Sequence, residues 1–147
     1  MTTATMTRIA KEYRWEMGHR LVQHQGLCKN IHGHSYTLRV EIEGNTDTTG
    51  MVMDFYDLSA LVQPIVDELD HCFICDDSDS VMLEFFLNHP MKAVVVPFPT
   101  TAENICAWFA DRLTPEFLRF ERLRSFTLRL HETERAYAEC SRTLRSE

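Results

Sequence analysis

Three histidines near the start of the chain have the residue type and the spacing of a metal site. His32 and His34 flank Gly33 in a segment of extended pattern, where residues i and i+2 project from the same face of a strand. Gly33 adds no side chain and lets the backbone or a ligand approach closely. His19 follows the preceding predicted strand and could reach the same point across a hairpin. Three imidazoles without an obvious fourth protein ligand indicate a catalytic Zn²⁺ site with one open position, although a lone His-x-His pair also occurs on exposed strands.

Cys28 lies four residues before His32, on the predicted loop that leads into the metal strand. A thiol near a dication ionises more readily because positive charge stabilises the thiolate, so Cys28 is a candidate reactive thiol. It could instead be a fourth zinc ligand, which would close the site and make it structural, and spacing alone does not decide between the two. The remaining cysteines are expected to pack in the core; they are Cys72, Cys75, Cys106 and Cys140.

Two further features could move protons. Asp70 and His71 close a predicted helix, and a neighbouring carboxylate can orient an imidazole and stabilise its charged form. The dipeptide alone is a weak signal, because Asp and His are common at helix ends. Glu132 follows a predicted strand, and a surface ion pair with Arg135 would explain it equally well.

Hydrophobic periodicity predicts the elements that must position these residues. Alternating apolar and polar residues predict strands over residues 7–16, 35–43 and 123–130, with 136–140 as a hairpin partner of the last. Apolar residues at helical spacing predict a helix that begins after an N-cap at Asp57 and ends near Leu69. The capping-box spacing from Thr100 to Glu103 opens a second helix, and residues 93–98 form an apolar run of strand type.

The order of these elements predicts an α+β fold for residues 1–147 as one domain. We expect a four-stranded antiparallel sheet with two helices on one face, in the order ββααββ, and an insertion around residues 72–98. Such a sheet leaves one face and both edges open, so we also expect self-association that covers them.

Composition and charge argue against several classes of partner. The 147 residues are 44% hydrophobic and 25% charged, as in ordinary globular proteins. A formal net charge of −7 argues against nucleic acid, since such partners require clusters of Lys and Arg. No apolar run approaches the ~18–20 residues of a membrane span, and residues 1–11 lack the apolar core of a secretory signal. We therefore expect a cytoplasmic protein, not bound to membranes, whose five cysteines are reduced.

Taken together, the segments resemble the 6-pyruvoyl-tetrahydropterin synthase superfamily, in the order of that family and from about residue 8 to residue 140. The blocks that carry the resemblance are His19–Leu21 with Cys28–His34, Gly50–Phe55, Leu69–His71, Pro99–Asn104 and Glu132–Thr133. Three residues separate the cysteine from the first histidine of His-Gly-His, as in the bacterial 6-carboxytetrahydropterin synthases, whereas the animal pyruvoyl enzymes have a longer gap. The acidic stretch after His71, which ends at Asp79, departs from the family's usual Leu-Asn continuation.

The resemblance implies that the zinc ligands are His19, His32 and His34, and that Cys28 is the catalytic thiol. It implies that Asp70 and His71 form a proton-relay pair. It also implies that Glu132 is the acid that anchors the pterin ring and can join the relay, and that Thr101 belongs to the pterin pocket. The implied substrate carries a triphosphate, and Lys29 and Arg20 are the cations nearest to the metal loop in sequence.

The resemblance further implies a zinc-dependent lyase that converts 7,8-dihydroneopterin triphosphate to 6-carboxy-5,6,7,8-tetrahydropterin, on the route to queuosine and related 7-deazapurines. Synthesis of 6-pyruvoyl-tetrahydropterin with the same zinc and base is the alternative within this class. A non-catalytic, zinc-stabilised assembly domain with Cys28 as fourth ligand is the alternative of another class. The family's tunnelling fold implies trimers that close their sheets into a β-barrel and stack as hexamers, with active sites at subunit borders.

Overall fold

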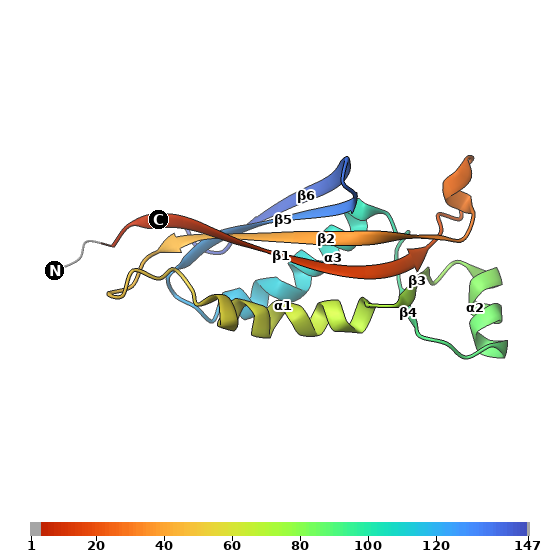
Figure 1. Ribbon diagram of the computed structural model, residues 1–147, viewed down its shortest axis with the longest axis horizontal. Coiled ribbons are helices and arrows are strands. Elements are labelled where there is room, and N and C mark those ends of the chain that lie inside the picture. The colour runs from red at the N-terminus through yellow and green to blue at the C-terminus, as the bar shows by residue number, and fades with distance from the viewer. Residues whose placement is uncertain (1–3, 147) are drawn as a thin grey trace.

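A sheet of six strands runs along the molecule, and the long helices α1 and α3 lie on one side of it (Figure 1). The computed structural model describes residues 4–146. In chain order the elements are β1 (Met6–His19), a 3₁₀ turn (Leu27–Lys29), β2 (His32–Asn45), α1 (Phe55–Leu69), β3 (Cys72–Asp76), α2 (Ser80–Asn88), β4 (Ala93–Val96), α3 (Ala102–Phe117), β5 (Leu123–Thr133) and β6 (Ala136–Thr143). The strand order across the sheet is β4-β3-β1-β2-β5-β6.

The two longest strands, β1 and β2, form the centre of the sheet. They pair antiparallel along their whole length, from Met6 opposite Asn45 to His19 opposite His32. Alternate residues face the helices and are buried, among them Tyr13, Trp15, Met17, Tyr36, Leu38, Val40 and Ile42. Because side chains alternate between faces with a period of two, this apolar set specifies both the buried face and the register.

The helices cover that face with their own apolar stripes. On α1 the buried residues follow helical spacing, and they are Leu58, Val62, Ile65, Val66 and Leu69. Each such side chain contributes roughly 1.5–3 kcal/mol when it is removed from water. The N-cap of α1 is Asp54, whose carboxylate accepts a hydrogen bond from the Tyr56 amide at 2.7 Å. The prediction of Asp57 as N-cap is therefore wrong, and Asp57 lies in the first helical turn instead.

The prediction of a four-stranded antiparallel sheet with two helices is also wrong in its counts. The predicted strands of alternating pattern form the antiparallel part of the sheet, β1, β2, β5 and β6, and the apolar run at residues 93–98 contains β4. Residues 72–98, expected as an insertion, supply β3, α2 and β4, so the described chain contains three α-helices and a mixed sheet. β3 runs parallel to β1 and β4 runs parallel to β3. A short, continuously apolar run shows no alternation from which its pairing could be read.

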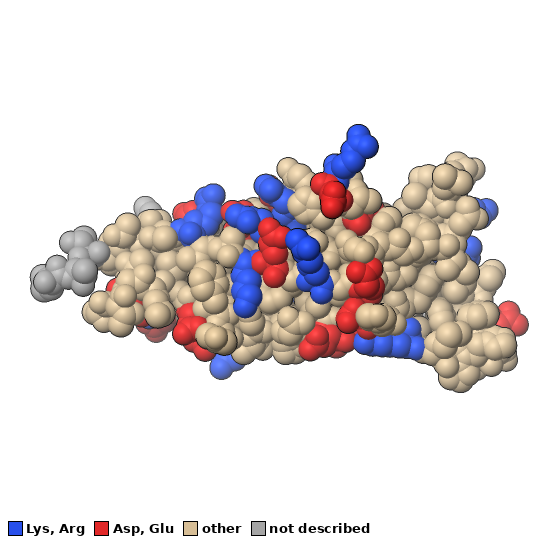
Figure 2. Space-filling view, viewed as in Figure 1, with Lys and Arg blue, Asp and Glu red and all other residues tan. Residues whose placement is uncertain are grey.

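The face of the sheet opposite the helices carries charged residues in pairs. Arg8 lies 2.9 Å from Glu43, and Arg129 lies 3.0 Å from Glu139. Figure 2 shows basic and acidic side chains next to one another over the middle of the molecule. Such exposed pairs contribute little to stability because water screens them, so they keep this face hydrated more than they stabilise it. Within residues 4–146, no helix has the length and apolar character needed to cross a membrane.

Candidate active site

The three histidines predicted as a cluster meet at one end of the helix-covered face. His19 ends β1 and lies opposite His32, which begins β2, and His34 lies two residues further along β2. The donor nitrogens of the three rings all lie within 4.8 Å of one another. The ring centroid of His19 is 4.6 Å from that of His32 and 5.2 Å from that of His34. The spacing in the sequence and the antiparallel register together produce this cluster.

Hydrogen bonds orient two of the rings toward the centre of the cluster. The Nδ1 atom of His19 lies 2.8 Å from the Thr100 carbonyl oxygen, and that of His32 lies 2.7 Å from the Asn30 carbonyl oxygen. A carbonyl can only accept, so each Nδ1 carries the proton and each Nε2 keeps its lone pair. The Nε2 atom of His19 is buried and has no hydrogen-bond partner. A buried polar atom without a partner is costly, and a metal ion at this point would satisfy it.

The electrostatics of the cluster also fit a metal. Burial is the main cause that lowers the pKa of His19 to about 4, and repulsion from His32 and His34 acts in the same direction. Burial also lowers the pKa of His34. Both rings are therefore neutral near pH 7, which is the state that binds metals. Three imidazole nitrogens with room for a further ligand fit Zn²⁺ in a catalytic site.

Glu132 lies at the edge of the histidine cluster. Its carboxylate oxygens are 3.9 Å from Nε2 of His19 and 3.9 Å from Nε2 of His34. It follows Leu130 by two residues on β5, and both side chains project toward the helix-covered face. Among the described residues, no ion pair joins Glu132 to Arg135, so the interpretation of Glu132 as half of that surface pair is wrong. A carboxylate near an open metal position can accept hydrogen bonds from a bound ligand.

Cys28 lies outside the group of clustered donor atoms. That group, within the described part of the chain, contains the three histidines and not the Cys28 thiol. Cys28 is partly exposed in the 3₁₀ turn, on the loop of residues 21–31 between β1 and β2, which we call the Cys28 loop. Its carbonyl accepts a hydrogen bond from the Leu21 amide at 2.8 Å, which closes the loop at its base. The geometry therefore gives no support to Cys28 as a fourth ligand.

Asp70 and His71 form the predicted pair but lie away from the histidine cluster. The Asp70 carboxylate is 2.9 Å from Nδ1 of His71. The same carboxylate accepts a hydrogen bond from the Glu16 amide, which is the main cause that lowers the pKa of Asp70. The His71 backbone has a φ of 61°, an uncommon value for a residue with a side chain. The His71 imidazole is 76% exposed, so a proton relay through it has open access.

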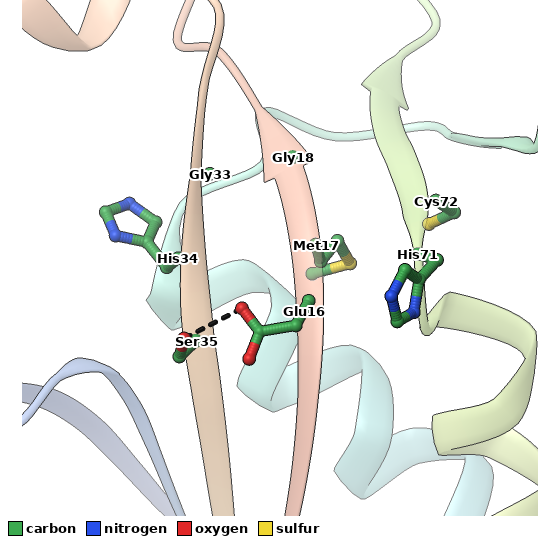
Figure 3. A pocket seen from close by; sticks show the side chains of 8 residues that line it. All are labelled: Glu16, Met17, Gly18, Gly33, His34, Ser35, His71 and Cys72. Atoms are coloured by element: carbon green, nitrogen blue, oxygen red, sulfur yellow. Dashed lines mark hydrogen bonds between the residues drawn. The ribbon is translucent and has the colours of Figure 1, made fainter.

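A hollow of about 380 Å³ lies over the ends of β1 and β2, between these two groups of residues. Figure 3 shows His34 on one side of the two strands and His71 on the other, next to Cys72. The lining of the hollow includes Gly18 and Gly33, whose lack of side chains keeps the hollow open. One chain thus brings His71 of the relay pair and His34 of the histidine cluster to a common hollow.

Thr101 and Thr100 have different roles at the start of α3. Thr101 is the N-cap, and its hydroxyl accepts a hydrogen bond from the Asn104 amide at 3.1 Å. It also lines a second hollow, of about 260 Å³, together with the first residues of the Cys28 loop. Thr100 is fully buried, and its carbonyl holds His19. This role of Thr100 has no signal in the sequence, because a backbone oxygen accepts a hydrogen bond whatever the side chain is.

The guanidinium of Arg20 is bonded to a carboxylate of the same chain. Two of its nitrogens lie 2.7 and 2.6 Å from the two carboxylate oxygens of Asp79. Arg20 is thus already paired and is no longer a candidate for binding phosphate. The remaining cysteines pack as expected: burial raises the pKa of Cys72 and of Cys75 to about 11 each.

Comparisons with known proteins show what the whole chain is similar to. The family model described as 6-pyruvoyl tetrahydropterin synthase matches residues 8–143. The chain is 37% identical over 142 residues to the 6-carboxy-5,6,7,8-tetrahydropterin synthase of Haemophilus influenzae, covering 91% of this chain and 98% of that protein. It is 35% identical over 126 residues to the enzyme of the same name from Aquifex aeolicus, covering 71% and 77%.

Solved structures with the same fold belong to more distant relatives. An uncharacterised protein of Wolinella succinogenes superposes with a TM-score of 0.78 at 24% identity, covering 92% of this chain and 98% of that one. The 6-pyruvoyl tetrahydropterin synthase of Plasmodium vivax superposes with a TM-score of 0.76 at 19% identity, covering 95% and 99%. At these identities the likeness shows the fold.

Proposed function

The chain belongs to the 6-pyruvoyl tetrahydropterin synthase family, and on that premise we propose that it is a 6-carboxy-5,6,7,8-tetrahydropterin synthase. Its substrate would be 7,8-dihydroneopterin triphosphate, and its place would be in the route to 7-deazapurines such as queuosine. The observation that carries the proposal is the buried cluster of His19, His32 and His34 beside Glu132, in a chain whose relatives bear that name over most of their length.

We assign Zn²⁺ to the three histidines, because their donors are clustered imidazole nitrogens and one of them is buried without a partner. When bound, the zinc would polarise the hydroxyl oxygens of the substrate side chain and so acidify the neighbouring C–H bonds. Thr100 and Asn30 hold the rings of His19 and His32 in the tautomer that this binding requires.

The protein's own groups would move the protons. Cys28 serves as the general base that removes a proton from the substrate side chain, since it is partly exposed on the loop that leads into the metal strand. His71 returns protons, with its ring held by the 2.9 Å contact to Asp70 and its other nitrogen free to exchange. Glu132 accepts hydrogen bonds from the pterin amino group and ring N–H, and Thr101 lines the pterin pocket. This division of roles makes the protein a lyase.

A homo-oligomer, a trimer or a hexamer, would complete the site. The short strand β4 and the strand β6 lie at the two edges of the sheet, where unpaired backbone groups can bond to another copy. The exposed His71 and His34 of the histidine cluster line a hollow that a neighbouring chain could close. Mixed oligomers of inactive Cys28→Ala and inactive Glu132→Ala chains should then regain part of the activity through hybrid sites. An active monomer in sedimentation would refute this arrangement.

The cell compartment is a smaller proposal. All five cysteines are unpaired thiols, as reducing compartments favour, so we infer a cytoplasmic enzyme.

The alternative product is 6-pyruvoyl-tetrahydropterin, which the name of the family model and of several structural relatives favours. The test is to incubate zinc-loaded protein with 7,8-dihydroneopterin triphosphate and to identify the products by mass spectrometry. Release of acetaldehyde with a 6-carboxy product supports the main proposal, whereas retention of the three-carbon side chain supports the alternative. No turnover by fully zinc-loaded protein refutes both, and would favour the non-catalytic assembly domain.

A further inference from the structure

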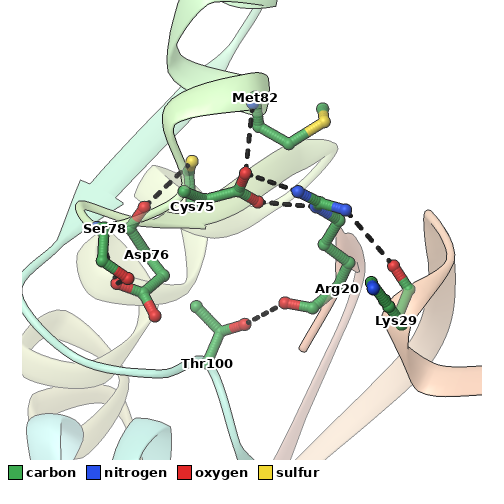
Figure 4. Close-up of polar contacts among 8 residues, drawn as sticks. Arg20, Lys29, Cys75, Asp76, Ser78, Met82 and Thr100 are labelled. Atoms are coloured by element: carbon green, nitrogen blue, oxygen red, sulfur yellow. Dashed lines mark hydrogen bonds and ion pairs between the residues drawn. The ribbon is translucent and has the colours of Figure 1, made fainter. Parts of the chain in front are cut away.

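A partly buried ion pair joins Arg20, the residue after His19, to the segment between β3 and β4. The Arg20 guanidinium binds Asp79 through two hydrogen bonds, of 2.7 and 2.6 Å. Asp79 is 2% exposed and is also the N-cap of α2, where it accepts a hydrogen bond from the Met82 amide at 3.2 Å. Such a two-point contact fixes both the distance and the angle between the groups, which a single-point contact does not. Figure 4 shows Arg20 between Lys29 and the start of α2 at Met82.

Arg20 also contacts the backbone of the Cys28 loop. A third guanidinium nitrogen lies 3.5 Å from the carbonyl oxygen of Lys29, the residue after Cys28. The carbonyl of Arg20 itself accepts a hydrogen bond from the Thr100 hydroxyl at 3.3 Å. Arg20 thus links three segments that are far apart in sequence, namely the Cys28 loop, the start of α2 and the start of α3.

The Cys28 loop has few other attachments. Within the described residues, the hydrogen bonds of residues 21–31 stay inside the loop or go to the adjoining Arg20 and His32. Most of its side chains are exposed, and Leu27 is 85% exposed. A loop held mainly by its own hydrogen bonds would move as a unit about its two ends. Through its contact with Arg20, the loop is connected to Asp79 at the start of α2.

We propose that Arg20 and Asp79 are positioning residues, which hold the Cys28 loop against the start of α2 and so fix the Cys28 thiol relative to the histidine cluster. This inference rests on the proposed function, in which Cys28 is the general base. A base misplaced by about 1 Å can cost on the order of 100-fold in rate, so loss of the Arg20–Asp79 contact, which we call the clamp, should lower kcat. It should change KM little, because neither residue is assigned to substrate binding.

The test compares Asp79→Ala and Arg20→Lys with a matched control, Glu68→Gln. Glu68 forms a contact of similar length, 2.7 Å to Arg112, between α1 and α3 and away from the site. Three measurements are made on each protein at full zinc content: hydrogen exchange of the peptide covering residues 21–31, the rate of Cys28 alkylation by iodoacetamide, and kcat with KM. Exchange in β2 and β5 reports whether the fold persists. Arg20→Lys keeps the charge but not the two-point contact, and it serves if Asp79→Ala does not fold.

For Asp79→Ala we expect exchange of the Cys28 loop and alkylation of Cys28 to rise about 10-fold. We expect kcat to fall about 10-fold or more with KM within about 3-fold, and zinc content to stay unchanged. Glu68→Gln should leave all of these as in the wild type. Unchanged loop exchange, loss of zinc, or a loosened loop with unchanged kcat would each overturn the inference. If the wild type itself does not turn over, the proposed function fails, and exchange and alkylation still decide whether the clamp holds the loop.

Discussion

Lowering the pH should destabilise the metal-free protein through His19. Its pKa in the folded state is about 4, chiefly because the ring is buried, against an ordinary value of 6.5. Below pH 6.5 the unfolded chain takes up a proton that the folded chain refuses, so stability falls as the pH falls and levels off near pH 4. The full difference corresponds to about 3 kcal/mol of unfolding free energy, and about 2 kcal/mol of it is lost between pH 7 and pH 5.

Between pH 6.5 and pH 5, the loss of stability caused by His19 can be separated from the losses caused by carboxylates. The pKa values of Asp47, Asp70 and Asp79 are lowered, so their contributions are lost only as the pH falls toward 4 and below. His34, whose pKa is also lowered, adds to the loss in the same direction as His19.

The assay is urea unfolding of metal-free protein at several pH values and one protein concentration, with His19→Gln as the comparison. Glutamine can still donate a hydrogen bond to Thr100 but does not titrate. The wild type should lose about 2 kcal/mol more than the variant over this pH range. Equal losses in the two proteins would refute the assignment of the effect to His19.

The remaining predictions concern the metal and the thiols. His34→Ala should lose most of an expected one zinc per chain, measured by elemental analysis, and near-full zinc content would contradict the ligand assignment. Cys28→Ala should keep zinc and fold but lose turnover, whereas Cys72→Ala, which removes a buried packing thiol, should remain much closer to the wild-type rate. Hydrogen peroxide should oxidise Cys106 and Cys140 to a disulfide with the release of two waters, because their sulfur atoms are 3.3 Å apart and the hydrogen bond from Cys106 lowers the pKa of Cys140. Peptide mapping under non-reducing conditions checks this, and both thiols remaining free would contradict it.

The parts of the fold that follow local patterns could be predicted from the sequence. The strands β1, β2 and β5 alternate apolar and polar residues, and α1 and α3 repeat apolar residues at helical spacing, so each element carries its own signal. The sequence pattern misplaces the start of α1, because Asp54 and Asp57 both precede apolar residues. Phe55, the first helical residue, is 47% exposed and so does not belong to the buried stripe from which the helix is predicted.

The parts that depend on distant partners could not be predicted. β3 and β4 pair parallel through a register that their short apolar runs do not encode. Arg20 and Asp79 are 59 residues apart, and the sequence around each residue does not indicate its partner. Sequence proximity to the metal loop suggested a phosphate ligand for Arg20, whereas the three-dimensional partner is a carboxylate.

The location of the histidine cluster follows from the same alternation that builds the core. His19 continues the buried set of β1, and His32 and His34 continue that of β2. A slip of one residue in either strand would move its histidines to the open face together with the whole apolar set, so the register that buries the core also assembles the ligands. Gly33 permits this assembly, since a Cβ at that position would lie 3.1 Å from the Met17 carbonyl oxygen. The histidine cluster thus lies at the end of the hydrophobic face, where imidazoles take the place of apolar side chains.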